Sequence, residues 1–254
     1  MAIESRHSSA AIEALAAREY ERAGDAYTRA AWETLAEPRD GQSPFEITEK
    51  GWVGRGLQAL TVATVAYRVA EQPERATHRA VEGVAIARDL EGIAERAPQS
   101  ACFAEFVADF RLVGGLDGAG EAYREAERAY RTGDEEIEEP QYWGTTPLFE
   151  AAAGTIQQVA RGSANGEIAV TWEDLHGPDP SQAGEFLAHR AQFKRQRFDS
   201  LLARTLSEGY LAAPRGTTEY GNDQYQCPSC ASSDVNWTGE QVLCLRCSTP
   251  MRRN

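Results

Sequence analysis

Apolar residues recur at steps of three and four positions through most of the first 212 residues, where alanine is dense and strand formers are sparse. This spacing places apolar side chains on one face of an α-helix and predicts a mainly helical body. After residue 212 the pattern changes to two short β-type runs, "DVNW" and "EQVLC", with a turn signal at Thr238-Gly239 between them. The chain therefore divides into a helical body and a small C-terminal β module.

Breaks in the helical pattern set the expected boundaries. Residues 133–147 carry an acidic run, two prolines and two glycines, which is typical of a linker. The linker would separate helical repeats over 1–132 from a helical extension over 148–212, in which "PLFEAAAGTIQQVARG" and "GEIAVTWEDL" are expected to be helical. A long last helix would end at Gly209, a common C-terminal stop. Residues 213–254 would form the β module, with "RGTTEY" as its outer strand.

One short sequence motif is repeated within the helical body. "AGDAYTRA" at 23–30 returns as "AGEAYREA" at 119–126, and "PERATHRAVEG" repeats the small residues at Ala76, Ala80 and Gly83. Small residues at these steps let two helices approach closely. The pattern resembles the tetratricopeptide family, which implies a scaffold of helical-hairpin repeats with a protein partner on them. The copies are spaced by 53 and 43 residues, longer than the family's repeat of about 34. An irregular α-bundle, in which the echo reflects composition alone, is the alternative.

The charge of the chain is strongly acidic and unevenly distributed. The formal net charge is −13, and only Lys50 and Lys194 among the 26 basic residues are lysines. This composition resembles the cytosolic proteins of salt-loving archaea, which implies a halophilic, cytoplasmic protein, although a GC-rich genome also favours arginine over lysine. From Phe186 onward nine basic residues face six acidic ones. A basic end on an acidic body suggests two binding roles on one chain.

Four of the five cysteines form two CxxC pairs separated by 13 residues: Cys227, Cys230, Cys244 and Cys247. Two such turns on a facing hairpin are typical of a zinc ribbon, in which four thiolates hold a structural Zn²⁺ and leave no open position. Two disulfides or a redox pair are the alternatives. The N-terminal residues lack the apolar core of a signal peptide, which favours zinc, and no apolar stretch is long enough to span a membrane. The fifth cysteine, Cys102, is expected to be a buried small side chain.

Basic and aromatic residues alternate in "HRAQFKRQRF" at 189–198. On a helix the basic residues of this region form one stripe, which could follow a phosphate backbone while aromatic rings stack on bases. The predicted nucleic-acid-binding residues are Arg190, Phe193, Lys194, Arg197, Arg204 and, on the β module, Trp237. The alternative is an amphipathic helix whose basic residues pair with the acidic body.

The sequence contains few candidate catalytic residues or motifs. Glu173, Asp174 and His176 in "WEDLHGPDP" could act as acid, base or metal ligands, but the chain has only four histidines and none lies beside a convincing nucleophile. A Gly-rich phosphate loop and HExxH are both absent. We therefore expect a non-enzymatic scaffold whose helical body holds a protein partner and whose C-terminal region holds RNA, single-stranded DNA or a ribonucleoprotein. A purely protein–protein adaptor, with the ribbon as a structural cap, is the alternative, and an enzyme is less favoured.

Overall fold

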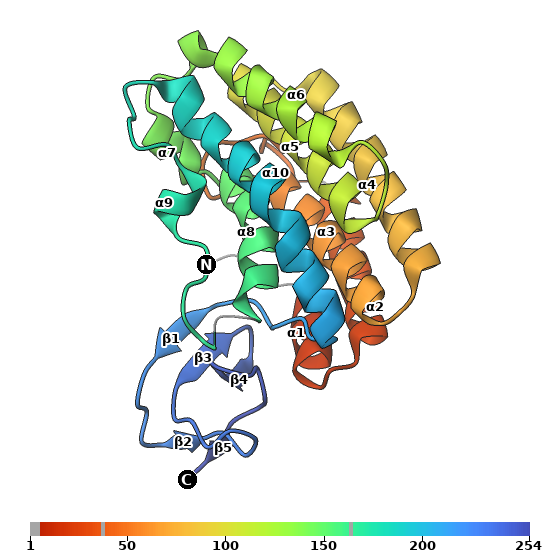
Figure 1. Cartoon of the computed structure of the whole chain (residues 1–254), viewed down its shortest axis with the longest axis vertical. Coiled ribbons are helices and arrows are strands. Elements are labelled where there is room, and N and C mark those ends of the chain that lie inside the picture. The colour runs from red at the N-terminus through yellow and green to blue at the C-terminus, as the bar shows by residue number, and fades with distance from the viewer. Residues whose placement is uncertain (1–5, 37–38, 163–164) are drawn as a thin grey trace.

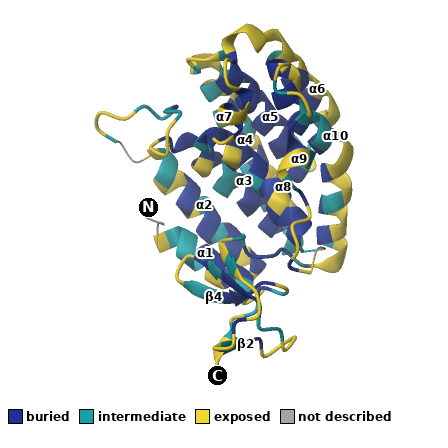
Figure 2. Cartoon of the chain, turned by 90° about the vertical axis from the view of Figure 1, so that its left-hand side faces the viewer, coloured by how far each residue is buried: buried dark blue, intermediate teal, exposed yellow. Residues whose placement is uncertain are grey.

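The computed structural model describes residues 6–36, 39–162 and 165–254. They form a bundle of helices with a small β module at one end, next to the first helix (Figure 1). Buried residues run through the whole bundle, whereas the tip of the β module is exposed (Figure 2). The prediction of a mainly helical chain with a small C-terminal β module is confirmed.

Six helices in the first half of the chain follow one another as three pairs, each packed on its neighbours in sequence. They are α1 (Arg6–Ala16), α2 (Tyr20–Ala36), α3 (Val53–Val69), α4 (Pro73–Ile93), α5 (Ala97–Val113) and α6 (Ala119–Thr132). The three segments with the shared small residues lie on α2, α4 and α6, the second helix of each pair. Most of these alanines and glycines are buried at helix contacts.

Two glycines show why small residues are required at these contacts. A Cβ at Gly24 of α2 would lie 2.7 Å from the ring of Tyr67 on α3, and one at Gly83 of α4 would lie 2.3 Å from the ring of Phe110 on α5. Both rings are buried. Each ring therefore packs directly on the backbone of the neighbouring helix, which would have to move to admit a side chain.

The second half of the helical body adds a short 3₁₀ turn and four helices: η1 (Asp134–Glu136), α7 (Pro140–Gly144), α8 (Pro147–Arg161), α9 (Trp172–Leu175) and α10 (Ala183–Glu208). Helix α8 packs against α3 and α5, and α10 lies across α6 and α8. The predicted long last helix is confirmed, and Gly209 ends it with a left-handed φ of 59°. This conformation costs glycine little, which suits the end of a helix.

Two predictions about this half are wrong. The predicted linker at 133–147 is packed, since Ile137 and Trp143 are each only 5% exposed and belong to one core that extends from α1 to residue 211. The ranges 1–132 and 148–212 therefore share a core instead of forming separate units. In "GEIAVTWEDL" only residues 172–175 are helical.

The β module contains two small antiparallel sheets. β1 (Thr217–Glu219), β3 (Val235–Thr238) and β4 (Gln241–Cys244) form a three-stranded sheet in the order β1-β3-β4, and β2 (Tyr225–Gln226) pairs with β5 (Arg252–Arg253). The predicted hairpin and outer strand are confirmed. Gly239 forms the tight turn between β3 and β4 with a φ of 56°, as its glycine identity predicts.

Hydrogen bonds fix the β module to the helical body. Arg161 at the end of α8 donates to the carbonyl oxygens of Ala213 and Leu245, the latter at 3.1 Å. Ser248 accepts a hydrogen bond from the Ala213 backbone at 3.1 Å. Leu243 of β4 packs with Ile12 of α1 in a small apolar cluster. The face of the sheet that carries Leu243 is thus turned toward the body.

Candidate metal centre

The four paired cysteines lie at one end of the hairpin, on two loops of matching geometry. In each loop the backbone N–H four residues after the first cysteine returns to that cysteine's carbonyl: Ala231 to Cys227 at 3.0 Å and Ser248 to Cys244 at 2.9 Å. Ala231 and Ser248 both have left-handed φ angles, 58° and 56°. Each loop therefore turns tightly enough to present both of its sulfur atoms to the same side.

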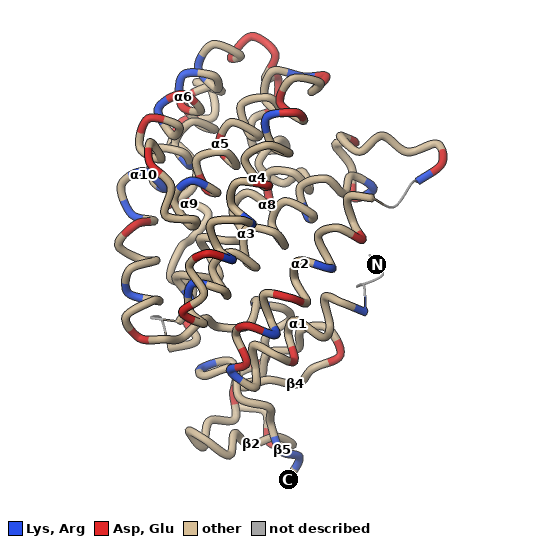
Figure 3. Tube along the Cα trace, turned by 90° about the vertical axis from the view of Figure 1, so that its right-hand side faces the viewer, with Lys and Arg blue, Asp and Glu red and all other residues tan. Residues whose placement is uncertain are grey.

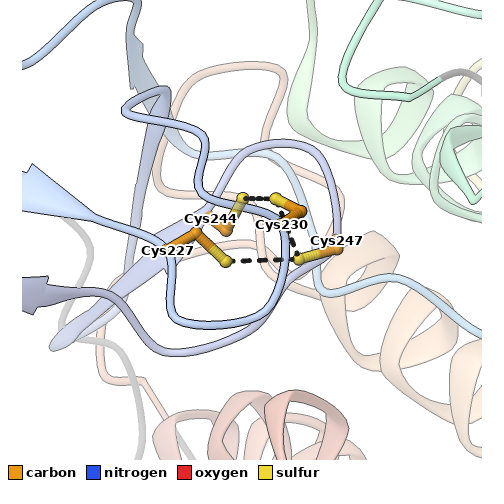
Figure 4. Close-up of side chains that lie close together, drawn as sticks. All are labelled: Cys227, Cys230, Cys244 and Cys247. Carbon is orange, nitrogen blue, oxygen red and sulfur yellow. Dashed lines mark hydrogen bonds between the residues drawn. The ribbon is translucent and has the colours of Figure 1, made fainter.

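The sulfur atoms face one another across a small space (Figure 4). The Sγ atoms of Cys230 and Cys244 are 3.5 Å apart, those of Cys227 and Cys247 are 3.6 Å apart, and those of Cys230 and Cys247 are 3.7 Å apart. All four lie within 4.8 Å of one another. A tetrahedron of sulfurs with metal–sulfur bonds of about 2.3 Å has edges of about 3.8 Å. The cluster therefore fits a tetrahedral metal ion.

The surroundings hold the two loops in place. The Arg246 side chain between Cys244 and Cys247 donates to Asp234 at 2.7 Å, and Asp234 accepts from the Gly221 backbone at 3.0 Å. The Thr249 hydroxyl lies 3.3 Å from the Cys247 sulfur. Cys230 is exposed whereas Cys227 and Cys244 are buried. The site thus lies at the surface but is anchored by the sheet.

Two of the residues predicted to bind nucleic acid lie inside the protein. Arg190 is 1% exposed and Lys194 is fully buried, on the face of α10 that packs against the core. The prediction of a continuous basic stripe along the surface of this helix is therefore wrong. Phe193 is half-buried against the core. Arg197 and Arg204 are exposed, and Arg204 pairs with Glu208 at 2.7 Å. Both acidic and basic residues lie along α10 (Figure 3).

The two buried cations pair with acidic residues of the body, as the alternative interpretation of this helix predicts, but in a buried ion network instead of at the surface. Arg190 binds Glu105 of α5 through two hydrogen bonds of 2.8 and 2.9 Å. Lys194 contacts Glu105 at 2.7 Å, Asp109 at 2.6 Å and the Ala152 carbonyl at 2.6 Å. An ammonium group has three N–H donors, and here each meets one acceptor. The two positive and two negative charges compensate one another.

Two tyrosines of α6 complete the network. Tyr123 donates to Asp109 at 2.6 Å and Tyr130 donates to Glu105 at 2.9 Å. The network thus ties α6 and α10 to α5. One signal in the sequence could have revealed it: Glu105 and Asp109 are four residues apart in "ACFAEFVADF", which is otherwise apolar. Carboxylates on an apolar helix need buried cations.

Burial and charge act in opposite directions on the acids of this network. Burial alone would raise the pKa of Glu105, but the positive charges of Arg190 and Lys194 lower it to about 2. Burial raises the pKa of Asp109 to about 6 against the opposing charge of Lys194. Burial also raises the pKa of the Cys102 thiol to about 12. Cys102 is therefore a neutral, buried side chain, as the sequence predicted.

Of the candidate acid–base residues, Asp174 and His176 take part in local packing and capping, whereas Glu173 is exposed. Asp174 closes a capping box with Thr171 at the start of α9. His176 is buried and stacks on Trp172, with ring centroids 3.6 Å apart, and burial lowers its pKa to about 4. Its Nε2 has no hydrogen-bond partner and lies 2.7 Å from where a Cβ at Gly144 would stand. Trp172, Phe186 and Gly144 therefore pack closely around the His176 ring.

The chain matches no protein-family model, no curated protein and no solved structure. Among the described residues, the four cysteines are the one group of histidine, cysteine and acidic side chains arranged to hold a metal ion. No helix in the described ranges is both long enough and apolar enough to cross a bilayer.

Proposed function

We propose that this chain is a non-enzymatic binding protein whose four cysteines hold a structural zinc ion and whose zinc ribbon binds RNA or single-stranded DNA. Four thiolate ligands suit zinc and leave no coordination position for a substrate. The ribbon buries few apolar side chains, among them Val235, Leu243 and Leu245. Zinc binding would therefore supply much of the free energy that folds this module.

The observation that carries the binding role is an aromatic pair on the ribbon. Trp237 and Tyr225 lie edge to face with ring centroids 5.4 Å apart, and both are partly exposed. Trp237 pairs across the sheet with Thr217 and Val242. Side chains alternate between the faces of a strand, so Trp237 lies on the face opposite to Asn236 and Leu243, which are turned toward the body.

Basic residues lie next to this pair. Arg253 is directly opposite Tyr225 in the β2–β5 pairing, and Arg252 is opposite Gln226. Both arginines are exposed, and Figure 3 shows this basic end at the tip of the module. Partly exposed aromatic rings beside arginines favour unpaired bases, because the rings stack on bases and the guanidinium groups contact phosphate. We therefore propose this surface of the ribbon, instead of the stripe on α10, as the nucleic-acid-binding surface.

The test is binding of a short single-stranded RNA to the full-length, metal-loaded protein, measured by fluorescence anisotropy at low and high salt. Stacking contributes about 1–3 kcal/mol per base, so Trp237→Ala should weaken binding about tenfold at both salt concentrations. The matched control is Trp32→Ala on α2, a tryptophan with 40% of its surface exposed, which should bind like the wild type. Absence of binding at any salt, or equal binding by Trp237→Ala, would reject the proposal.

A protein partner on the helical body is the second candidate function. Three exposed apolar side chains favour it: Trp32 is 40% exposed, Val81 is 51% and Ile93 is 66%. Helix α8 packs against α3 and α5, so a partner would contact the other faces of the hairpins. Pull-downs from a high-salt extract with nuclease test this idea. Proteins that the wild type retains and Trp32→Ala loses would support it, and identical sets would reject it.

A further inference from the structure

A pocket of about 390 Å³ lies where the helical body meets the ribbon. One wall comes from α3 and α8 and carries Gln58, Gln157, Gln158 and Arg161. The opposite wall is the segment that enters the ribbon, with Pro214 and Arg215, and the rim is the loop 167–170. We call this space the junction pocket. Its volume is in the range of pockets that hold small molecules.

The junction pocket contains two cations without a carboxylate partner among the described residues. Arg161 is 5% exposed and bonds only neutral carbonyls, while its Nε is buried without a partner. Arg215 bonds the Gly166 carbonyl at 2.8 Å and the hydroxyls of Thr218 and Tyr220. A buried charge is costly unless an opposite charge compensates it. The uncompensated charge of the buried Arg161, together with the partly exposed Arg215 on the same lining, therefore makes the pocket attractive to an anion.

Electrostatics support this assignment. Burial lowers the pKa of Arg161 to about 10, and the like charge of Arg215 contributes to the lowering. The acidic residue of the lining, Glu167, is exposed on the rim and interacts with Arg246 of the ribbon. An anion bound beside Arg215 would thus supply a counter-charge that the protein itself does not place there.

The rest of the lining can recognise a flat polar ring. The carboxamides of Gln58 and Gln157 offer both donors and acceptors, and Gln158, whose Nε2 donates to the Ala212 carbonyl at 2.9 Å, offers its oxygen. Ile168, Val170 and Pro214 add apolar surface. A Cβ at Gly154 would lie 2.0 Å from the Gln58 Nε2, so the absence of a side chain at 154 allows Gln58 to lie over α8 in the pocket. Carboxamides pair well with the edge of a nucleobase.

We propose that the junction pocket binds a nucleoside monophosphate, with the phosphate beside Arg215 and the base among the carboxamides. The ligand can be a free nucleotide or one nucleotide of a strand. The site is separate from the aromatic pair of the ribbon, because neither Trp237 nor Tyr225 lines the pocket. Binding here does not depend on the proposed role of that pair.

The experiment is calorimetric titration of the full-length, zinc-loaded protein with AMP, adenosine and inorganic phosphate. AMP should bind at least tenfold more tightly than adenosine or phosphate, because only AMP engages both walls. Arg215→Gln should weaken AMP binding about tenfold or more, since it removes a charged hydrogen-bond donor. Gly154→Ala should also weaken it by displacing the flexible Gln58 side chain. Gly120→Ala on α6, where a Cβ meets nothing within 4 Å, is the matched control and should bind like the wild type.

The proposal would be overturned by no saturation by AMP at about 10 mM, or by AMP binding that is unchanged in both Arg215→Gln and Gly154→Ala. Adenosine binding as tightly as AMP would also overturn it, because the cations would then have no role. Displacement of AMP by a single-stranded oligonucleotide would identify a strand as the source of the nucleotide, and lack of displacement would identify the free nucleotide. Trp237→Ala should leave AMP binding unchanged, which separates this test from that of the aromatic pair.

Discussion

The helical body and the ribbon differ in how they accommodate groups that are costly to bury. The body pairs its buried charges with one another, whereas the ribbon brings four cysteine sulfurs together. In the body, Glu105, Asp109, Arg190 and Lys194 compensate one another without any added ion. In the ribbon, the Sγ atoms of four cysteines lie within 4.8 Å of one another and could hold a metal ion. The charges of the body therefore need no added ion, whereas we propose that the ribbon folds around a metal. We therefore expect the helical body and the ribbon to unfold separately and under different conditions.

The largest effect should follow loss of a metal ligand. Cys244→Ser should unfold the ribbon, since metal binding contributes about 10–16 kcal/mol to comparable zinc modules. The helical signal in circular dichroism should change little, while the dispersed NMR resonances of residues 217–254 should collapse. Cys102→Ser, which changes the cysteine that lies outside the cluster, should keep the metal. A ribbon that stays folded in Cys244→Ser would contradict the separation of the two parts.

The second largest effect should be a loss of stability of the helical body when its buried ion network is broken. Glu105→Leu leaves Arg190 and Lys194 buried with only Asp109 to compensate them, and should destabilise the protein by about 3–5 kcal/mol in denaturant unfolding. The control is Glu121→Leu on α6, whose carboxylate pairs with Arg124 and Arg128 at the surface and should change stability little. Equal effects of the two variants would show that the buried network does not hold the body together.

His176 should lower the free energy of unfolding of the body at acidic pH. Burial lowers its pKa from 6.5 to about 4, so between these values the unfolded chain binds a proton that the folded chain does not. Stability should therefore fall as the pH drops from 6.5 to 4, by about 2–3 kcal/mol from this residue. His176→Phe keeps an aromatic ring and should remove that loss.

Asp109 should have the opposite effect on the pH dependence of stability. Its pKa is raised to about 6, so the folded chain takes up a proton more readily and gains stability as the pH falls from 6 toward 4. The difference between the wild type and His176→Phe therefore isolates the histidine better than the wild-type curve alone. Identical pH dependence of the two proteins would show that His176 is not responsible.

The smallest expected effect is a gain in the stability of the metal-loaded ribbon. Ala231 has a left-handed φ of 58°, and Ala231→Gly should stabilise the metal-loaded ribbon by about 0.5–1 kcal/mol. Ser248→Gly should not, although its φ is 56°, because it removes the hydroxyl that accepts from Ala213. Thermal melting of the ribbon resonances in NMR measures both. A loss of stability in Ala231→Gly would contradict the loop geometry.

Local patterns predicted the secondary structure well, because they depend on neighbours in sequence. The long helix ending at Gly209 and the hairpin around Gly239 each follow from residues a few positions apart. The four cysteines were likewise predictable, since CxxC spacing fixes the geometry of a loop. Tetrahedral convergence of their sulfurs is then a short-range consequence of the hairpin.

Long-range pairing explains what the sequence could not reveal. Periodicity treats a charged residue as exposed, so Arg190 and Lys194 were predicted to form a surface stripe. Their partner Glu105 lies 85 residues from Arg190, and no local pattern connects them. The junction pocket poses the same problem, because Arg161 and Arg215 meet only when the ribbon packs on α8. The composition of the acidic segment 133–147 is typical of a linker, and only its contacts with distant residues place Trp143 in the core.

Direct measurement of the metal tests the central claim that the ribbon is built around zinc. Protein purified under anaerobic conditions should contain about one zinc per chain, and X-ray absorption should show four sulfur ligands at about 2.3 Å. Cys244→Ser should lose the metal under the same conditions. Metal-free protein in which Cys227, Cys230, Cys244 and Cys247 form two disulfides, or a metal bound mainly by oxygen or nitrogen, would contradict the account.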